Sequence, residues 1–419
     1  MRHASWHASV LLMLLASSIS APQSLAQSSV SPRVVAVGDI HGDFDAFRGI
    51  LTHAGIIDAG GRWIAGNSTL VQLGDFTDRG PNVRAVMDFL VDLETQATAA
   101  GGRVAVLLGN HEVMNVLGEG QDVTAAIYET FADEQSQRRR EAGYDTYMKL
   151  CSARSVTLGR IIPGVSQPVS KEVWMATHPV GFLEYREAFS PQGRYGRWLR
   201  SKPAVLQVGD TVFLHAGVNP ERAPRRLEDI NRQVLAEIKR FDDLSSRMLD
   251  RKLILPFFTL SEMLAAAQVE VAAAAAASNT GPADPFGPSV AVDPLTDRDP
   301  LGLTRLLDIG RWSVLDPDGP LWFRGFAMWS PEAGAIQMKP LLQRYGVAHF
   351  VVGHTIPPTR RITPRLSAAV FLIDTGMLSS YVPGGTASAL EIQDGRFTAI
   401  YPNERLTLLD SRVRAPEKR

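Results

Sequence analysis

Five short apolar runs, each followed directly by a polar cluster that contains glycine, constrain the fold of this chain more than any other feature. The runs are rich in β-branched residues, as the buried strands of α/β proteins are. They are Arg33–Val37, Leu70–Leu73, Val104–Leu108, Val212–Leu214 and His349–Val352. The first three end about 35 residues apart, which leaves room for a helical crossover between parallel strands. Because ligands of open α/β sheets bind outside the carboxyl ends of the strands, we expect the five polar clusters to form one site.

The polar clusters contain the residue types of a metal site. In chain order they are Gly38-Asp39-Ile40-His41-Gly42, Gly74-Asp75-Phe76-Thr77-Asp78-Arg79-Gly80, Gly109-Asn110-His111-Glu112, His215-Ala216-Gly217 and Gly353-His354-Thr355. The chain has nine histidines, of which two precede residue 26. Four of the other seven fall in these clusters, namely His41, His111, His215 and His354. Core packing does not explain that concentration.

Six residues of the clusters are expected to bind two divalent metal ions. Carboxylate, amide carbonyl and imidazole groups suit manganese, iron or zinc. Two metals about 3.5–4 Å apart share a carboxylate and can activate a bridging water for in-line attack on phosphorus. The expected ligands are Asp39, His41, Asp75, Asn110, His215 and His354. For any one of these histidines taken alone, a structural role is the simpler interpretation.

Three further residues of the clusters are suited to phosphoryl chemistry. Arg79 can bind two phosphoryl oxygens at once, and His111 can protonate a leaving oxygen. Asp78 would hold the tautomer of His111 and keep its ring charged. Simpler roles stay open, since Arg79 could form a surface salt bridge and Asp78 could cap a helix that begins near Pro81.

The order of the clusters resembles the signature of the calcineurin-like metallophosphoesterases, and within them of the phosphoprotein phosphatase (PPP) branch. The motifs GDIHG, GDFTDRG, GNHE, HAG and GHT carry this resemblance over most of residues 33–376. The resemblance implies an α/β fold, a four-layer α/β/β/α metallophosphoesterase sandwich with helical insertions. It also implies a dinuclear metal centre at the edges of the two sheets.

The resemblance further assigns a role to each site residue. Asp75 would bridge the two metals. The other ligands would be Asp39 and His41 on one metal, and Asn110, His215 and His354 on the other. Arg79 and Asn110 would contact the substrate phosphate. His111 and Asp78 would form the general-acid pair.

Finer features resemble the bacterial Shewanella-like phosphatases. The segment Leu321-Trp322-Phe323-Arg324-Gly325 replaces the loop of eukaryotic members that carries a second phosphate-binding arginine. We therefore expect Arg324 to bind phosphate, although it could instead stack on Trp322 or Trp329. Residues 373–376 (IDTG), with Tyr381 beyond them, are similar to the same subgroup.

Residues 1–26 are interpreted as a secretory signal peptide. Arg2 precedes an apolar run at residues 8–16, which is too short to span a bilayer comfortably. Small residues at positions 24 and 26 offer a cleavage site before Gln27. We therefore expect export, most simply to a bacterial periplasm, with no membrane span after the signal is removed. An uncleaved anchor is the alternative.

Residues 33–419 are expected to form one metallophosphoesterase domain with two helical insertions, at about residues 112–203 and 221–310. Residues 265–300 begin with an alanine-rich stretch, and five prolines follow between positions 282 and 300. This composition predicts a flexible segment at residues 265–300.

Together these features predict an exported phosphomonoesterase that hydrolyses phosphotyrosine or phosphoserine/threonine in a protein or peptide. The 43 Lys and Arg against 44 Asp and Glu leave a net charge of −1, which gives no general electrostatic reason to bind nucleic acid. Cys151 is the one cysteine, so a thiolate metal cluster is excluded. A diadenosine polyphosphate hydrolase is one alternative, although such enzymes usually lack the acidic residue at Asp78. A non-catalytic phosphate-binding protein is the other. No feature predicts an oligomeric state.

Overall fold

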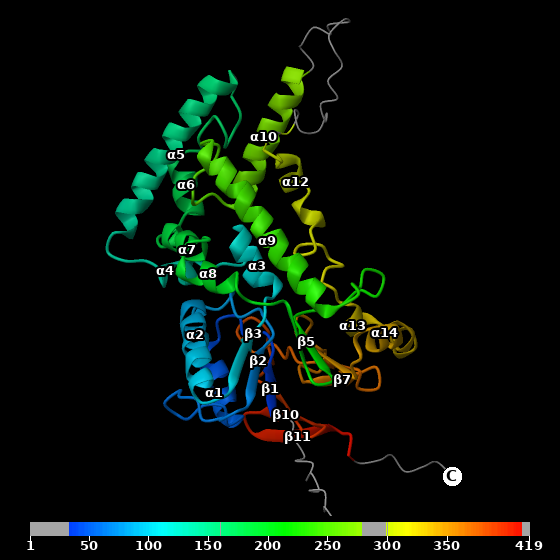
Figure 1. The fold of residues 1–419 in the computed structure, drawn as a ribbon. Helices are drawn as coiled ribbons and strands as arrows, with labels where there is room; N and C mark the ends of the chain where they lie inside the picture. The colour runs from blue at the N-terminus through cyan, green and yellow to red at the C-terminus, as the bar shows by residue number, and fades with distance from the viewer. Residues whose placement is uncertain (1–32, 160, 279–298, 300, 413–419) are drawn as a thin grey trace, which may run out of the picture. The chain divides into compact units, whose positions relative to one another are not determined.

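The computed structural model describes residues 33–412 apart from residue 160, residues 279–298 and residue 300 (Figure 1). The predicted signal peptide, residues 1–26, lies outside the described residues, as does the proline-rich part of residues 265–300. Within the described part of the chain, no helix is both long enough and apolar enough to cross a membrane.

The first sheet has six strands, three of which carry the first three apolar runs of the sequence. Its order is β11 (Glu404–Asp410), β10 (Arg396–Tyr401), β9 (Ala389–Gln393), β1 (Val34–Val37), β2 (Thr69–Gln72) and β3 (Arg103–Val106). Strands β1, β2 and β3 are parallel, and helices α1 (Phe44–His53) and α2 (Val83–Ala99) connect them. Strands β9, β10 and β11 extend the other edge as antiparallel strands.

The second sheet has five strands. Its order is β4 (Val205–Val208), β5 (Thr211–Leu214), β6 (His349–Val352), β8 (Val370–Leu372) and β7 (Thr363–Arg365). Strands β5, β6 and β8 are parallel, so their carboxyl ends lie at one edge. All five strands predicted from the apolar runs are confirmed.

Most helices lie in two long connections, one between β3 and β4 and the other between β5 and β6. The first holds α3 (Asn110–Leu117), α4 (Ala125–Glu129), α5 (Ser136–Leu158), α6 (Lys171–Thr177), α7 (Phe182–Phe189) and α8 (Arg194–Leu199). The second holds α9 (Leu227–Asp250), α10 (Leu260–Ser278), α12 (Leu303–Leu307), the 3-10 helix η1 (Ile309–Arg311), α13 (Gly325–Met328) and α14 (Pro331–Tyr345). These connections overlap the predicted insertions at residues 112–203 and 221–310.

Within the segment predicted to be flexible, residues 265–278 are helical. These residues continue α10, because alanine has the highest intrinsic helix propensity.

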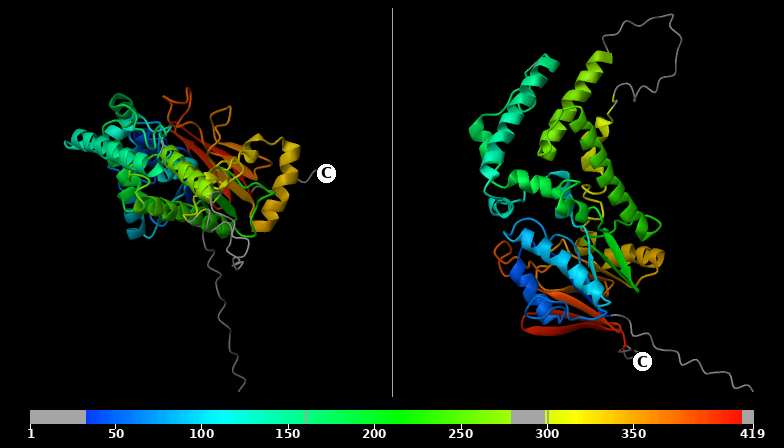
Figure 2. Two further views of the ribbon diagram at one scale, coloured as in Figure 1. Left: turned by 90° about the horizontal axis from the view of Figure 1, so that it is seen from above. Right: turned by 60° about the vertical axis from the view of Figure 1, so that its left-hand side comes forward.

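The two sheets pack face to face. Successive side chains of a strand point to opposite faces of its sheet, so each strand contributes to an inner core between the sheets and to an outer core under the helices. Val34 and Ala36 of β1 share a buried core with Phe213 of β5 and Val351 of β6. Val35 of β1 belongs instead to the outer core, together with buried residues of α1, α2 and α14. Helices α2 and α14 lie on opposite sides of the pair of sheets (Figures 1 and 2). The layers therefore follow the predicted order of helix, sheet, sheet and helix.

Candidate active site

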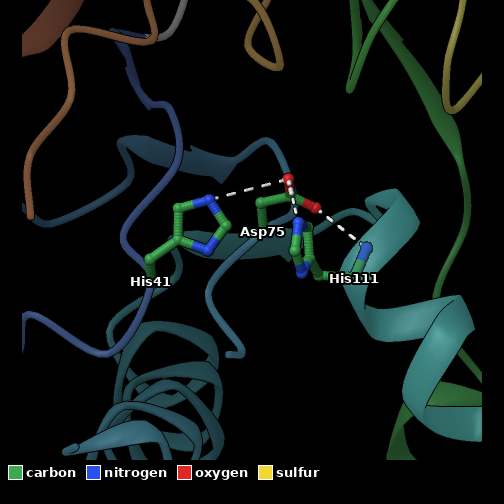
Figure 3. Close-up of side chains that lie close together, drawn as sticks. All are labelled: His41, Asp75 and His111. Carbon is green, nitrogen blue, oxygen red and sulfur yellow. Dashed lines mark hydrogen bonds and ion pairs between the residues drawn. The ribbon is translucent and has the colours of Figure 1, made fainter. Parts of the chain in front are cut away.

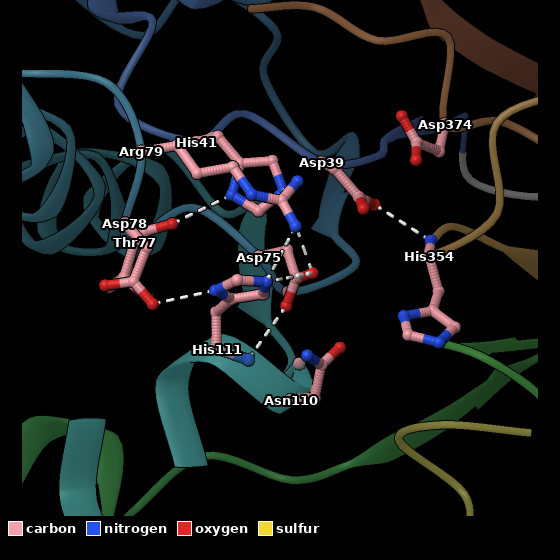
Figure 4. Close-up of polar contacts among 12 residues, drawn as sticks. Asp39, His41, Asp75, Thr77, Asp78, Arg79, Asn110, His111, His354 and Asp374 are labelled. Atoms are coloured by element: carbon pink, nitrogen blue, oxygen red, sulfur yellow. Dashed lines mark hydrogen bonds and ion pairs between the residues drawn. The ribbon is translucent and has the colours of Figure 1, made fainter. Parts of the chain in front are cut away.

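The polar clusters of the sequence meet where parallel strands of both sheets end (Figure 4). Asp39, Asp75 and Asn110 follow β1, β2 and β3 of the first sheet. His215 and His354 follow β5 and β6 of the second sheet. Each sheet therefore supplies part of one site at its carboxyl edge, as expected for ligand-binding positions in α/β folds.

The turns that carry the site residues have an uncommon backbone conformation. Five of these residues have a left-handed φ, namely His41 (47°), Asp75 (54°), Asp78 (68°), Arg79 (67°) and His354 (63°). Residues other than glycine rarely adopt this region, at a cost of order 1–3 kcal/mol each. Such strain persists only where surrounding contacts enforce it, so its concentration here supports a functional interpretation.

The carboxylate of Asp75 lies at the centre of the site (Figure 3). Its Oδ2 lies 3.8 Å from Nε2 of His41, 3.8 Å from Nε2 of His111 and 3.2 Å from Nε2 of His215. Its Oδ1 accepts a hydrogen bond from the backbone N–H of His111. Burial would raise the pKa of Asp75, but the imidazoles of His215 and His111 hold that pKa well below its usual value. An ionised carboxylate between two groups of imidazoles is suited to bridge two metal ions.

His215, Asn110 and His354 form one half of the site together with Asp75. Nε2 of His215 lies 2.9 Å from Oδ1 of Asn110 and 3.2 Å from Nδ1 of His354. Nδ1 of His215 donates to the carbonyl of Leu73, so Nε2 carries a lone pair. Nε2 of His215 and Oδ1 of Asn110 therefore face each other as two hydrogen-bond acceptors. A bound cation would offset the repulsion between their lone pairs.

His41 has the same tautomer in the other half of the site. Its Nδ1 donates to the carbonyl of Thr77 at 2.9 Å, which leaves the Nε2 lone pair facing Asp75. Burial lowers the pKa of His41 to about 3 and the pKa of His354 to about 2, so both rings are neutral. Neutral imidazoles oriented by backbone carbonyls are typical metal ligands. The residues present fit two divalent metal ions.

Asp39 lies beside the turn that carries His354. Its Oδ1 accepts the backbone N–H of His354 at 3.1 Å, and a Cβ at Gly353 would lie 2.3 Å from the same oxygen. Burial and the nearby carboxylate of Asp374 raise the pKa of Asp39. This bond uses one oxygen of Asp39 and supports the turn that carries His354, and the expected role of Asp39 as a metal ligand stays a prediction. Two groups of side chains lie close enough together to hold an ion, namely His41–Asp75–His111 and Asp75–His215–His354.

His111 and Asp78 are paired as predicted. Nδ1 of His111 lies 2.7 Å from Oδ2 of Asp78, and both side chains are buried. Burial would lower the pKa of His111, but the carboxylates of Asp75 and Asp78 raise that pKa to about 9. Burial raises the pKa of Asp78, while its hydrogen bond with His111 acts in the opposite direction. Asp78 thus contacts the catalytic candidate directly rather than only capping a helix.

Arg79 points between two imidazoles of the site. Its Nη1 lies 2.7 Å from Nε2 of His41, and its Nη2 lies 3.1 Å from Nε2 of His111. The guanidinium also lies 4.5 Å from the ring centre of Tyr381. No carboxylate of the described residues forms an ion pair with it, so the surface salt bridge considered for Arg79 is absent from this part of the chain.

Arg324 approaches the site from the connection between β5 and β6, directly before α13. Its Nη1 donates to the carbonyl of His354 at 3.0 Å and to Oγ1 of Thr355 at 2.9 Å. The ring of Trp322 lies at the edge of the His354 ring, with the centres 5.9 Å apart. The hydrogen bonds of Arg324, rather than stacking, determine where its side chain lies.

Among the described residues, three histidines lie outside the site, and each has structural contacts. His178 stacks on Trp174 with the ring centres 4.1 Å apart. Nδ1 of His53 and Nδ1 of His349 each hydrogen-bond a backbone carbonyl. These contacts give the three residues structural roles.

Three buried polar residues of the site have functions that the sequence did not predict. The carboxylate of Glu112 accepts hydrogen bonds of 2.7–3.0 Å from the backbone N–H groups of Asp75, Phe76, Thr77 and Gly109. Asn115 donates to Oδ1 of Asp78 at 2.8 Å. Burial raises the pKa of Asp374, beside Asp39, to about 6. The position of Asn115 one helical turn after His111 was the only local signal for its role.

Sequence comparisons relate this chain to known phosphatases. Residues 32–201 match the family described as calcineurin-like phosphoesterase. Shewanella-like protein phosphatase 2 of Arabidopsis thaliana is 34% identical over 216 residues, which are 50% of this chain and 52% of that protein. Shewanella-like protein phosphatase 1 of Plasmodium berghei (strain Anka) is 24% identical over 348 residues, which are 82% of this chain and 67% of that protein. The chain therefore spans about half the length of the Arabidopsis relative.

A structural comparison concerns the fold of the chain. The crystal structure of a cold-active protein-tyrosine phosphatase from a psychrophilic Shewanella species matches with a TM-score of 0.53 and 22% identity. The match covers 90% of this chain and 80% of that one. The likeness shows the fold, which is the predicted calcineurin-like metallophosphoesterase fold. The resemblance to Shewanella-like phosphatases is likewise confirmed.

Proposed function

We propose that this chain is a phosphomonoesterase that uses two divalent metal ions, because residues 32–201 match the calcineurin-like phosphoesterase family. The observation that carries the proposal is the position of Asp75, whose Oδ2 faces His41 and His111 on one side and His215 on the other. The donor groups combine imidazole, carboxylate and amide oxygen, which suits manganese, iron or zinc.

The residues around the metal positions have distinct tasks in this proposal. Metals bound there would stabilise charge on the phosphoryl oxygens and lower the pKa of water. Arg79 and Arg324 lie at the two sides of the site and would hold the phosphoryl oxygens, with Asn110 nearby. His111, oriented by Asp78, would donate a proton to the leaving oxygen.

We propose a phosphorylated protein or peptide as the substrate. The two relatives are named protein phosphatases, and the Shewanella enzyme of similar fold is named a protein-tyrosine phosphatase. Phosphotyrosine is therefore our first candidate, and phosphoserine or phosphothreonine the second. The buried Asp78–His111 pair favours monoester hydrolysis over cleavage of a diadenosine polyphosphate, since an alkoxide or phenoxide leaving group needs a proton more than a nucleotide does.

We also propose that the protein is exported, on the basis of the signal-like composition of residues 1–26. Expression of the full chain in a bacterium, followed by cell fractionation and amino-terminal sequencing, tests this. Recovery from the periplasm with Gln27 as the first residue is expected. Recovery from the cytoplasm with the leader intact would contradict export.

The activity is tested with purified protein and three substrates, assayed with and without Mn²⁺. These are a phosphotyrosine peptide, a phosphoserine/threonine peptide and diadenosine tetraphosphate. Metal-dependent release of phosphate from a peptide is expected, and the faster peptide identifies the preferred residue. Cleavage of the dinucleotide alone would replace the proposal with the alternative hydrolase. Binding of two metals without turnover of any substrate would leave the non-catalytic alternative.

A further inference from the structure

A chain of hydrogen bonds leads from the general-acid pair into the helical connection between β3 and β4. Asp78 uses both carboxylate oxygens: Oδ2 lies 2.7 Å from Nδ1 of His111, and Oδ1 accepts from Nδ2 of Asn115 at 2.8 Å. Oδ1 of Asn115 accepts in turn from the hydroxyl of Tyr185 at 2.5 Å. Asn115, Asp78, His111 and Tyr185 are all at most 3% exposed, so water does not compete for these bonds.

The amide of Asn115 can serve this chain in one orientation only. Its Nδ2 donates both to Asp78 and to the backbone carbonyl of His111, at 2.8 and 2.9 Å. A flipped amide would place its oxygen against the carboxylate of Asp78 and its NH₂ group against the carbonyl of His111. The hydroxyl of Tyr185 meets the amide oxygen and therefore favours the observed orientation.

Tyr185 is itself fixed by its surroundings. Its ring stacks on Phe189 at 4.4 Å and meets the edges of Phe131 at 4.9 Å and Tyr128 at 5.1 Å. The next residue, Arg186, donates to the backbone carbonyl of Asn115 and so joins α7 to the last turn of α3. The orientation of Asn115 is thus determined by α7, which lies about 70 residues further along the chain.

We propose that Asn115 and Tyr185 are positioning residues for proton donation in the hydrolysis proposed above, on which this inference rests. Together they hold the carboxylate of Asp78 at the angle that directs Nε2 of His111 toward the leaving oxygen. Water attacks phosphorus, forms the new P–O bond and loses a proton to solvent. The P–O bond to the leaving group breaks as it does so, and the electron pair of that bond stays on the leaving oxygen, which takes the proton from Nε2 of His111. His111 is left neutral, with Nδ1–H still bonded to Asp78.

The test compares two phosphate monoesters that differ in how much the leaving group needs a proton. p-Nitrophenolate leaves readily without one, whereas phenolate benefits from protonation. Tyr185→Phe is expected to lower kcat for phenyl phosphate about 5–20-fold, which is part of the roughly 100–10,000-fold that general-acid catalysis typically contributes. For p-nitrophenyl phosphate we expect kcat to fall about twofold or less, because its leaving group depends less on the proton. Asn115→Leu should show the same selectivity with a larger loss on phenyl phosphate. An equal loss on both esters would overturn the proposal, because it indicates a merely structural role.

Two controls separate positioning from stability. Tyr195 belongs to the same aromatic cluster and is equally buried, but its hydroxyl bonds Asp88, away from the site. Tyr195→Phe is therefore expected to change the melting temperature without changing the ratio of the two esters. In a His111→Asn background, Tyr185→Phe should produce no further loss of kcat on either ester. A further loss in that background would also overturn the proposal.

The outcomes for the wild-type protein keep the two proposals apart. An inactive wild-type protein with both metals bound would refute the proposed function. An active wild-type protein whose ester ratio is unchanged by Tyr185→Phe and Asn115→Leu would refute only the positioning role.

Discussion

At the scale of single residues, one carboxylate oxygen connects the two halves of the site. Oδ2 of Asp75 faces His41 and His111 in one half and His215 in the other, at 3.2–3.8 Å. The histidines of the two halves follow strands of different sheets. Both expected metal positions therefore depend on the side chain of Asp75.

Asp75→Asn is expected to lower the metal content below two per chain and kcat/KM for a phosphomonoester on the order of 1,000-fold, because the amide cannot neutralise two cations. Elemental analysis of the purified protein and steady-state kinetics measure the two effects. Asp58→Asn is the matched control, because Asp58 is half-buried and forms its ion pair with Arg62 rather than with a residue of the site. Full metal content in the Asp75 variant would refute its bridging role.

His111→Asn is expected to retain both metals and to lower kcat about 100–10,000-fold, since a general acid contributes on that scale. The same two measurements apply. Unchanged activity would remove the general-acid assignment. Loss of a metal would make His111 a ligand, a role that its place in the donor group with His41 and Asp75 also allows.

At the scale of elements, the buried carboxylate of Glu112 connects the start of α3 to the turn after β2. It accepts the backbone N–H groups of three consecutive residues, Asp75 to Thr77, and the N–H of Gly109. The turn that strains the backbone of Asp75 is therefore held by hydrogen bonds to a charged acceptor, which are stronger than neutral ones.

Glu112→Gln is expected to lower the free energy of unfolding by about 2–4 kcal/mol, because the amide NH₂ would face backbone donors that lose their acceptor. Urea denaturation followed by circular dichroism measures this change. Glu134, exposed and on a loop, provides the control Glu134→Gln, for which no change is expected. Equal stability of the Glu112 variant and the wild type would contradict the proposed role of these hydrogen bonds.

Elements with a strong local pattern could be predicted from the sequence, and elements fixed by distant contacts could not. Strands β1, β2, β3, β5 and β6 were predicted because a buried strand is a continuous apolar run. The contact of Tyr185 with Asn115 has no local signature, since the two residues come together only when α7 packs on α3. The hydrogen bond between Asp39 and His354 has no local signature either, because it joins residues 315 positions apart.

At the scale of the whole fold, the site lies where two sheets meet. The first sheet contributes the residues after β1, β2 and β3, and the second contributes His215 and His354. The order of the motifs predicted this meeting, because each motif follows a strand and parallel strands share one carboxyl edge. A metal pair bound there would therefore connect the sheets.

Added Mn²⁺ is expected to raise the melting temperature of metal-free protein by about 3–6 °C, because ligands that bind only the folded state stabilise it by mass action. Differential scanning fluorimetry with increasing Mn²⁺ measures the shift. The Asp75→Asn variant should show a much smaller shift. An equal shift of the melting temperature in that variant would mean that the stabilising Mn²⁺ binds outside the site around Asp75.

The central claim is that one site, built by both sheets around Asp75, hydrolyses phosphomonoesters with two metals. The most direct measurement is the rate of phosphate release from a phosphotyrosine peptide as metal-free protein receives known equivalents of Mn²⁺. We predict negligible release without metal and saturation near about two equivalents per chain. Full activity in metal-free protein, or saturation at one equivalent, would contradict the claim.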